Sequence, residues 1–496
     1  MKWILAVLFI AMLLIGAGYL LTNSQSADED VSTSSEAMAL CEAGTADFLA
    51  FRLRAAVDKL ERALELDPLL AEASISRAFA FGRLGETDNF KLEMARADSL
   101  TGLIVDDQRR MLSELRLASL PDTRFYGMKD SLLTRLEFEL PDNLFVLEAR
   151  AMVATREGDS EEQERRWKDI LEVDPNYATS YNMLGYLELN RGNYEQSIEY
   201  MQKYAFLAAD QANPHDSLGE VLMVLGRYEE AEEAFRRSVQ MQPDFYHSLI
   251  NLGKSYLARG RMHDGLDILE KVRTEVEGSE LAKRIDREII GMFLMADFQS
   301  ELDRATAEFI GRYPEDGTSC FYRGIRLAYR HDFDAASAVM DSCLLKWRAK
   351  DSYRYSSQQS GFVEIAAKTF DAILAEAAGE PDTAVRMWRN VLTLMVDKRA
   401  IHEQWYERYR LAANLYESGQ PADALAEITP ILAVNPRLFN VLELAVSCYL
   451  ETGQVESARQ ALSQLQWCVE RSDSDFPARA EATRLAALVA EAEGNI

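Results

Sequence analysis

Apolar residues spaced three and four positions apart predict that most of this chain folds into amphipathic α-helices. Residues 181–189 (YNMLGYLEL) carry one such apolar face, and residues 231–239 (AEEAFRRSV) carry another. A glycine stands between faces of this kind, and glycine ends a helix readily because it adopts the left-handed conformation without steric cost. The pattern therefore predicts pairs of helices joined by tight turns, and each hairpin must bury its apolar face against a neighbour.

The pattern recurs at an interval of 34 residues. One column holds the glycine between the helices, a second holds Leu-Gly inside the first helix, and a third holds a large apolar residue inside the second helix. These columns are Gly158, Gly192, Gly226 and Gly260, then Leu184-Gly185, Leu218-Gly219 and Leu252-Gly253, then Met201, Phe235 and Leu269, with Gly419 and Gly453 keeping the interval near the C-terminus. The small residues let two backbones approach closely while the large ones fill the space beside them. The sequences VDP, MQP and VNP end second helices at 173–175, 241–243 and 434–436, because proline lacks the N–H that would continue the helix.

This unit resembles the tetratricopeptide repeat, above all at 181–204 (YNMLGYLELNRGNYEQSIEYMQKY) and 215–238 (HDSLGEVLMVLGRYEEAEEAFRRS). The resemblance implies an all-α fold, an α-solenoid superhelix of antiparallel helix hairpins. Roughly twelve hairpins fill the chain when degenerate units are counted, which lack the glycine, the proline or the 34-residue spacing. Residues 347–364 break the register, which predicts an insertion or a long loop there. The expected segments are degenerate hairpins over 37–141, a well-preserved array over 142–276, a degenerate helical region over 277–399, a repeat pair over 400–470 and a capping helix over 471–496.

The N-terminal 22 residues predict a transmembrane anchor or a signal segment. No charged residue interrupts the chain from Trp3 to Leu21, a length close to that needed to span a bilayer. Lys2 on one side and the acidic SADED on the other predict a cytoplasmic N-terminus and an extracytoplasmic (periplasmic) repeat array. We favour an uncleaved anchor, with a cleaved signal and a secreted or periplasmic product as the alternative. The polar residues 23–36 then form a flexible linker.

Composition and charge narrow the classes of function. A net charge of −27 argues against nucleic-acid binding, which needs a clustered basic face. The most basic stretch, 397–410, interleaves acids with its cations and is interpreted as a solvated helix face. The five cysteines form no C-x-x-C pair, the five histidines form no H-E-x-x-H, and no phosphate-binding or nucleophile motif is present. The sequence therefore predicts no enzyme activity, no cofactor and no metal site.

Cysteine and tryptophan positions carry structural predictions. Cys320 and Cys343 fall at matching levels of one hairpin, so a disulfide is geometrically open to them, but we expect buried free thiols. Cys448 and Cys468 lie about two turns apart and should not pair. Trp167 and Trp388 occupy the large-residue column and are expected in the core.

Residues 215–217 read His-Asp-Ser and look like a hydrolase triad. They are neighbours at the start of a helix, where successive side chains diverge by about 100°. A triad needs its members to converge. We therefore interpret this stretch as the beginning of a hairpin, with Pro214 in the first turn and Asp216 near the positive end of the helix dipole.

In proteins that resemble this repeat, the first helix of each hairpin lines a concave groove that binds a peptide or a partner helix. The positions that would line it here are Asn182, Tyr186, Asn190, Asp216, Glu220, Met223, His247, Lys254, Tyr406, Tyr409 and Tyr416. Asp216 and Glu220 depart from the basic clamp that holds peptide carboxylates in some relatives, so the expected ligand is cationic or neutral. The alternative is that these residues form ordinary solvated helix faces.

These observations predict a non-catalytic scaffold or adaptor that binds other proteins and is held at a membrane. The repeats also resemble arrays linked to bacterial serine/threonine kinases and signalling regulators, so a regulatory or sensory module is the second hypothesis. The kinase motifs themselves are missing. A third hypothesis is an enzyme with an unrecognised site in 277–400, which a compact, non-repetitive fold in that region would support.

Overall fold

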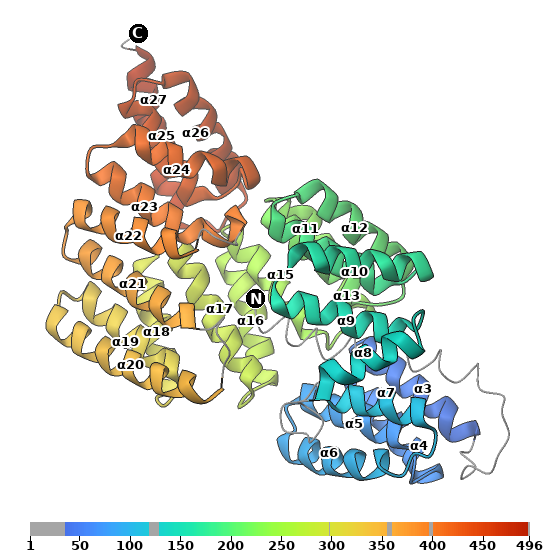
Figure 1. Cartoon of the computed structure of the whole chain (residues 1–496). Helices are drawn as coiled ribbons and strands as arrows, with labels where there is room; N and C mark the ends of the chain where they lie inside the picture. The colour runs from blue at the N-terminus through green and yellow to red at the C-terminus, as the bar shows by residue number, and fades with distance from the viewer. Residues whose placement is uncertain (1–34, 119–127, 297, 355–359, 396–399, 495–496) are drawn as a thin grey trace. The chain divides into compact units, whose positions relative to one another are not determined.

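The computed structural model describes residues 35–118, 128–296, 298–354, 360–395 and 400–494 (Figure 1). Throughout this part of the chain the regular elements are helices, and twenty-four of them pair into twelve hairpins, α3 to α26, before the final helix α27. The solenoid of antiparallel hairpins that the sequence predicts is confirmed. By its internal contacts the chain divides into two compact units, Met1–Leu187 with Gln196–Pro214, and Glu188–Glu195 with His215–Ile496.

The first unit holds the N-terminal hairpins and most of the fifth. Its helices are α3 (Ser35–Leu49), α4 (Leu53–Leu66), α5 (Ala71–Leu84), α6 (Thr87–Thr101), α7 (Asp107–Leu117), α8 (Lys129–Glu139), α9 (Leu144–Glu157), α10 (Ser160–Val173), α11 (Ala178–Arg191) and α12 (Tyr194–Leu207). The division between the units falls within the hairpin of α11 and α12, and a few residues at their shared turn belong to the second unit.

The second unit continues the repeats to the C-terminus. Its helices are α13 (Asn213–Val224), α14 (Tyr228–Met241), α15 (Tyr246–Ala258), α16 (Met262–Glu275), α17 (Glu280–Ala296), α18 (Gln299–Arg312), α19 (Gly317–Tyr329), α20 (Phe333–Arg354), α21 (Ser360–Ala377), α22 (Pro381–Met395), η2 (Ile401–Gln404), α23 (Trp405–Glu417), α24 (Pro421–Val434), α25 (Phe439–Glu451), α26 (Val455–Glu470) and α27 (Pro477–Gly494).

The glycine and proline columns act as the sequence predicts. The six turn glycines have φ between 68° and 80°, which a residue with a Cβ adopts only under strain: Gly158, Gly192, Gly226, Gly260, Gly419 and Gly453. Helices α10, α14 and α24 end at Val173, Met241 and Val434, just before the three x-Pro sequences. These local signals therefore mark the turns of six hairpins and the ends of three second helices.

The first helices approach the second helices closely at the Leu-Gly column. A Cβ built on Gly185 would lie 2.8 Å from the Cε of Met201, and one on Gly219 would overlap the ring of Phe235. Met201, Phe235, Trp167 and Trp388 are completely buried, which confirms their predicted core positions.

Two predicted segments, 347–364 and the N-terminal residues 1–36, are compared with the described helices. Helix α20 continues to Arg354 and α21 begins at Ser360, so the described part of 347–364 is helical and the predicted long loop is wrong for it. The 22 residues of α20, against 14 in each of α10, α12 and α14, agree with the alternative prediction of an insertion. The predicted anchor, 1–22, and most of the linker, 23–36, lie outside the described residues, and α3 already begins at Ser35. None of the helices within the described ranges combines the length and apolarity that a bilayer crossing requires.

Candidate functional site

The residues predicted to line a groove differ in how accessible they are. Asn182, Asp216 and Tyr409 are each less than a tenth exposed, so their side chains are enclosed by the packing of the helices and offer little surface to a ligand. The other eight are partly exposed: Tyr186 and Asn190 on α11, Glu220 and Met223 on α13, His247 and Lys254 on α15, and Tyr406 and Tyr416 on α23. The groove hypothesis stays a prediction and now rests on these eight residues.

The first turn of α13 holds the three residues that resemble a triad. Helix α13 begins at Asn213, and His215, Asp216 and Ser217 are all buried, which confirms the interpretation of this stretch as a helix start. The hydrogen bonds of Asp216 run to the next hairpin, because Ser248 Oγ donates to its carboxylate at 2.7 Å. Asp216 thus ties α13 to α15.

A second donor joins the two acids of α13. Asn251 Nδ2 lies 3.2 Å from Asp216 Oδ1 and 3.2 Å from Glu220 Oε1. Burial raises the pKa of Asp216 to about 7, and the negative charge of Glu220 adds to this effect, while the bonds from Ser248 and Asn251 oppose it. Asp216 therefore changes charge near neutral pH. One turn further along α15, Lys254 pairs with Glu288 of α17 at 2.9 Å.

The basic stretch near α23 is not simply a solvated face. Arg410 is buried and pairs with Glu376 of α21 at 2.8 Å, and the indole N–H of Trp388 donates to the same carboxylate at 2.6 Å. Arg408 pairs with Glu427 of α24 at 2.6 Å. The interpretation of 397–410 as a solvated helix face is therefore wrong for these two arginines, whose partners on α21 and α24 could not be assigned from the local charge pattern.

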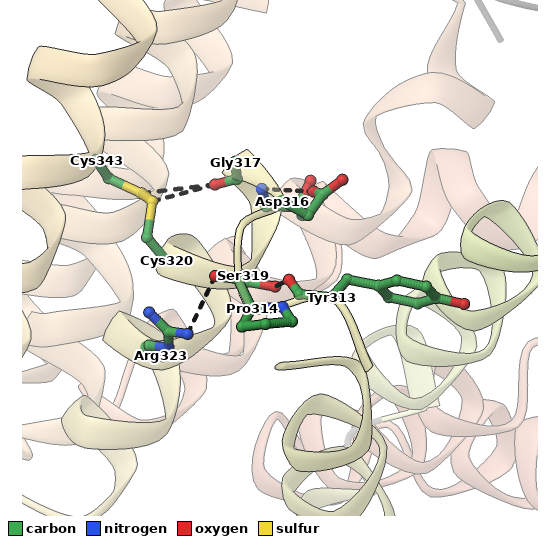
Figure 2. Close-up of a disulfide and its surroundings, with 9 residues drawn as sticks. Tyr313, Pro314, Asp316, Gly317, Ser319, Cys320, Arg323 and Cys343 are labelled. Atoms are coloured by element: carbon green, nitrogen blue, oxygen red, sulfur yellow. Dashed lines mark hydrogen bonds between the residues drawn. A yellow bond between two sulfur atoms is a disulfide. The ribbon is translucent and has the colours of Figure 1, made fainter. Parts of the chain in front are cut away.

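A disulfide joins α19 to α20 (Figure 2). The Cα atoms of Cys320 and Cys343 lie 5.8 Å apart, so the pair bridges two antiparallel helices without displacing either. The expectation of buried free thiols is wrong for this pair, and the geometric alternative that the matched levels allowed is the one observed. Cys448 and Cys468 are free, as predicted.

The start of α19 beside the disulfide is held by several hydrogen bonds (Figure 2). Asp316 caps the helix by accepting from the Thr318 amide at 2.9 Å, and Ser319 Oγ donates to the Tyr313 carbonyl at 2.6 Å. Arg323 donates to the Pro314 carbonyl at 3.2 Å. The disulfide therefore fixes an already ordered turn to α20.

The region proposed for an unrecognised enzyme site consists of hairpins. Residues 277–400, where described, form α17 to α22, and they pair in the same antiparallel manner as the other repeats. The compact, non-repetitive fold that would have supported an enzyme is not what these described residues form.

Comparison with known proteins matches this architecture. Two models of the tetratricopeptide repeat match the chain, one at 217–280 and 409–475 and the other at 167–199. The chain is 25% identical over 140 residues to the human protein O-mannosyl-transferase TMTC3 and 27% identical over 92 residues to mouse superkiller complex protein 3. These matches cover 28% and 18% of this chain, and only 15% and 6% of the two relatives.

Solved structures that align with the chain include yeast Tom70 and the tetratricopeptide domain of P58(IPK). Tom70 is 12% identical, with 93% of this chain and 97% of that chain aligned at a TM-score of 0.38. The P58(IPK) domain is also 12% identical, with 92% and 99% aligned at a TM-score of 0.23.

Proposed function

Because the chain is a tetratricopeptide-repeat protein, we propose that it is a protein-interaction scaffold that binds a partner peptide or helix on the first helices of its hairpins. The observation that carries this proposal is that first helices in both units, α11, α13, α15 and α23, bear partly exposed polar and aromatic side chains. Such a mixture suits an extended peptide, since polar groups bind its main chain and tyrosines contact its side chains.

We further propose that the array is held at a membrane and faces an oxidising, extracytoplasmic compartment. The uncharged run from Trp3 to Leu21 supports an anchor. The Cys320–Cys343 disulfide supports the compartment, because disulfides persist outside the reducing cytosol. Trapping the thiols with an alkylating reagent in intact cells tests this placement. The proposal expects both cysteines to resist alkylation until a reductant is added, and free thiols at both positions would contradict it.

Affinity capture of the full chain from membranes tests the scaffold. Tyr186→Ala on α11 removes a ring from the proposed binding face, whereas Tyr200→Ala removes a partly exposed ring from the second helix of the same hairpin. We expect the first substitution to reduce recovery of a stoichiometric partner and the second to leave it unchanged. Equal recovery with both variants would count against the first-helix face.

Reconstitution with the captured partner separates a passive scaffold from a regulatory module. A scaffold leaves the activity of the partner unchanged on binding, whereas a regulatory module alters it.

A further inference from the structure

Within the second unit, three turns that recur every 34 residues contact turns about 200 residues further along the chain. We call this set of contacts the clasp. On one side it comprises the turns at 191–194, 225–229 and 259–263, which contain the positive-φ glycines Gly192, Gly226 and Gly260. On the other side it comprises the turns at 401–405, 435–437 and 472–476, which precede α23, α25 and α27.

The middle of the clasp is a tightly packed polar contact. Asn435 is 1% exposed, and its Nδ2 donates to the hydroxyl of Tyr228 at 3.0 Å. Arg437 pairs with Glu229 at 2.5 Å, and its guanidinium lies 4.1 Å from the ring centroid of Trp467. A Cβ on Gly226 would overlap the amide of Asn435, so the turn glycine is also required by the turn that docks on it.

One end of the clasp is an ion pair around His263. The Asp473 amide donates to the Gly260 carbonyl at 3.0 Å, and the His263 amide donates to the Asp473 carboxylate at 2.9 Å. The ring Nδ1 of His263 lies 2.7 Å from the same carboxylate, and Nε2 lies 3.7 Å from that of Asp475. Each ring nitrogen therefore faces a different carboxylate, which suits a protonated imidazole that donates to Asp473 and is attracted by the charge of Asp475.

The other end of the clasp encloses the ring nitrogens of His402, a half-buried residue. The ring of Tyr194 meets that of His402 edge-on at a centroid distance of 6.0 Å, and Trp405 lies 6.4 Å from His402 on the other side. Both ring nitrogens of His402, the Tyr194 hydroxyl and the Trp405 indole N–H are buried without a hydrogen-bond partner in the structure as described. A proton added to His402 would therefore place a positive charge on a ring whose nitrogens find no hydrogen-bond acceptor among the described residues.

The two histidines respond to acid in opposite directions. Asp473, through its hydrogen bond and its charge, raises the pKa of His263, and the charges of Asp475 and of Asp267 on α16 add to this. Burial lowers the pKa of His402 to about 4. A raised histidine pKa gives a contact that is present at low pH and lost as the pH rises, whereas a lowered one gives a contact that is lost as the pH falls below the ordinary histidine value.

The other charged groups near these ends do not reverse this behaviour. Beside His263, Arg261 pairs with Asp264 on the same helix. On the Tyr194 side, Glu188 is neutralised by Arg191 at 2.8 Å, and burial raises the pKa of Tyr194 to about 12, so that its hydroxyl stays neutral. Glu403 follows His402 in the same turn of η2.

We infer that the clasp is a pH-responsive device whose two ends loosen under opposite conditions, the His402 end in acid and the His263 end in base. The central contact through Asn435 and Arg437 then acts as the pivot. A change of pH would shift the C-terminal hairpins against the turns of α11 to α16 without breaking the array. This inference does not depend on the proposed function.

Hydrogen exchange of the full chain, corrected for intrinsic rates, tests the device at about pH 5.5 and about pH 8. At the lower pH we expect peptides covering 192–195 and 401–405 to lose about tenfold in protection, because opening this end lets His402 regain its ordinary pKa and take up a proton. Peptides covering 260–263 and 472–476 should instead lose about twofold to fivefold at the higher pH, as for an exposed ion pair. This measurement needs only the wild-type chain and therefore does not depend on whether a variant folds. Parallel changes at both ends, or none, would overturn the inference.

Two substitutions locate the effect. His402→Phe keeps an aromatic ring between Tyr194 and Trp405 and should abolish the pH response at that end alone, whereas His263→Gln should abolish it at the other end alone. His331→Asn is the control, since His331 lies in the α19–α20 turn, away from the clasp, with a positive φ that asparagine tolerates. A pH response that survives at the mutated end, or that disappears in the control, would contradict the assignment.

Discussion

The turn at Gly226 needs a glycine for two reasons, its backbone conformation and its close contact with Asn435, and the substitution Gly226→Ala can separate them. Its φ of 68° disfavours any residue with a Cβ, and the new Cβ would also overlap Oδ1 of Asn435 and lie 2.9 Å from its Cγ. Gly453 provides a matched control. It ends the first helix of a repeat with a φ of 73°, but no atom lies within 4 Å of the position of its Cβ.

The expected losses of stability differ by the contribution of the clasp. The left-handed conformation costs a residue with a Cβ about 1–2 kcal/mol, and this applies to Gly226→Ala and Gly453→Ala alike. Overpacking against the buried Asn435 costs about 1–3 kcal/mol more and applies only to Gly226→Ala. We therefore expect Gly226→Ala to lower the free energy of unfolding by about 2–5 kcal/mol and Gly453→Ala by about 1–2 kcal/mol.

Hydrogen exchange is the suitable assay, because a long repeat array need not unfold in one cooperative step. The Arg437 amide donates to Asn435 Oδ1 at 3.1 Å, so its exchange reports directly on the overlap. Gly226→Ala should accelerate exchange at 435–437 as well as in its own turn, whereas Gly453→Ala should affect its own hairpin alone. The same local loss in both variants, with no change at 435–437, would refute the reasoning.

Three further predictions follow from buried contacts. Reducing the Cys320–Cys343 disulfide, or replacing Cys343 by alanine, should destabilise the α19–α20 hairpin by about 3 kcal/mol, as expected for a separation of 23 residues. Hydrogen exchange in that hairpin should become faster. Unchanged protection would show that the disulfide contributes nothing to its stability. Because the pKa of Asp216 is raised to about 7, its contribution to stability is complete at acidic pH and is lost as the pH rises towards 7. Asp216→Asn should therefore remove a decline in the denaturation midpoint between about pH 4 and pH 7. An identical decline in the variant would contradict the assignment. Glu376→Ala should lower the free energy of unfolding, measured by chemical denaturation, by about 3–5 kcal/mol, because it leaves Arg410 buried without its partner. A loss below about 1 kcal/mol would show that the ion pair is solvated.

The hairpins could be predicted from the sequence because their causes are local. A glycine at Gly158 or Gly260 ends its own helix, and the x-Pro at 241–243 ends α14, whatever the rest of the chain does. The fit of Gly219 against Phe235 is also local, since the two residues lie in one hairpin. A fixed interval then extends each local conclusion to the other repeats.

The candidate site was harder to predict because burial depends on the neighbouring hairpin. Asp216 occupies a first-helix position that would be open in an isolated hairpin, but Ser248 and Asn251 of α15 enclose it. Arg410 looks solvated within its own helix, and only α21 supplies Glu376. Cys320 and Cys343 lie at matching heights along the two helices of one hairpin, so the sequence showed that they could meet. A matching height, however, cannot distinguish two free thiols from a disulfide.

Neither a local signal nor the packing of neighbouring hairpins predicts the clasp, because its partners are separated by 207 to 213 residues and belong to no common sequence pattern. Closing so long a loop costs more chain entropy than closing a hairpin, although the cost rises only with the logarithm of the length. The hairpins therefore gain their stabilising contacts first, and the clasp closes on turns that are already formed. We expect a contact that closes last and encloses polar atoms without partners among the described residues, such as those of His402, to open at a lower cost in free energy than a hairpin does. A pH response located at the clasp leaves the hairpins folded, whereas the same titration inside a hairpin would unfold that hairpin.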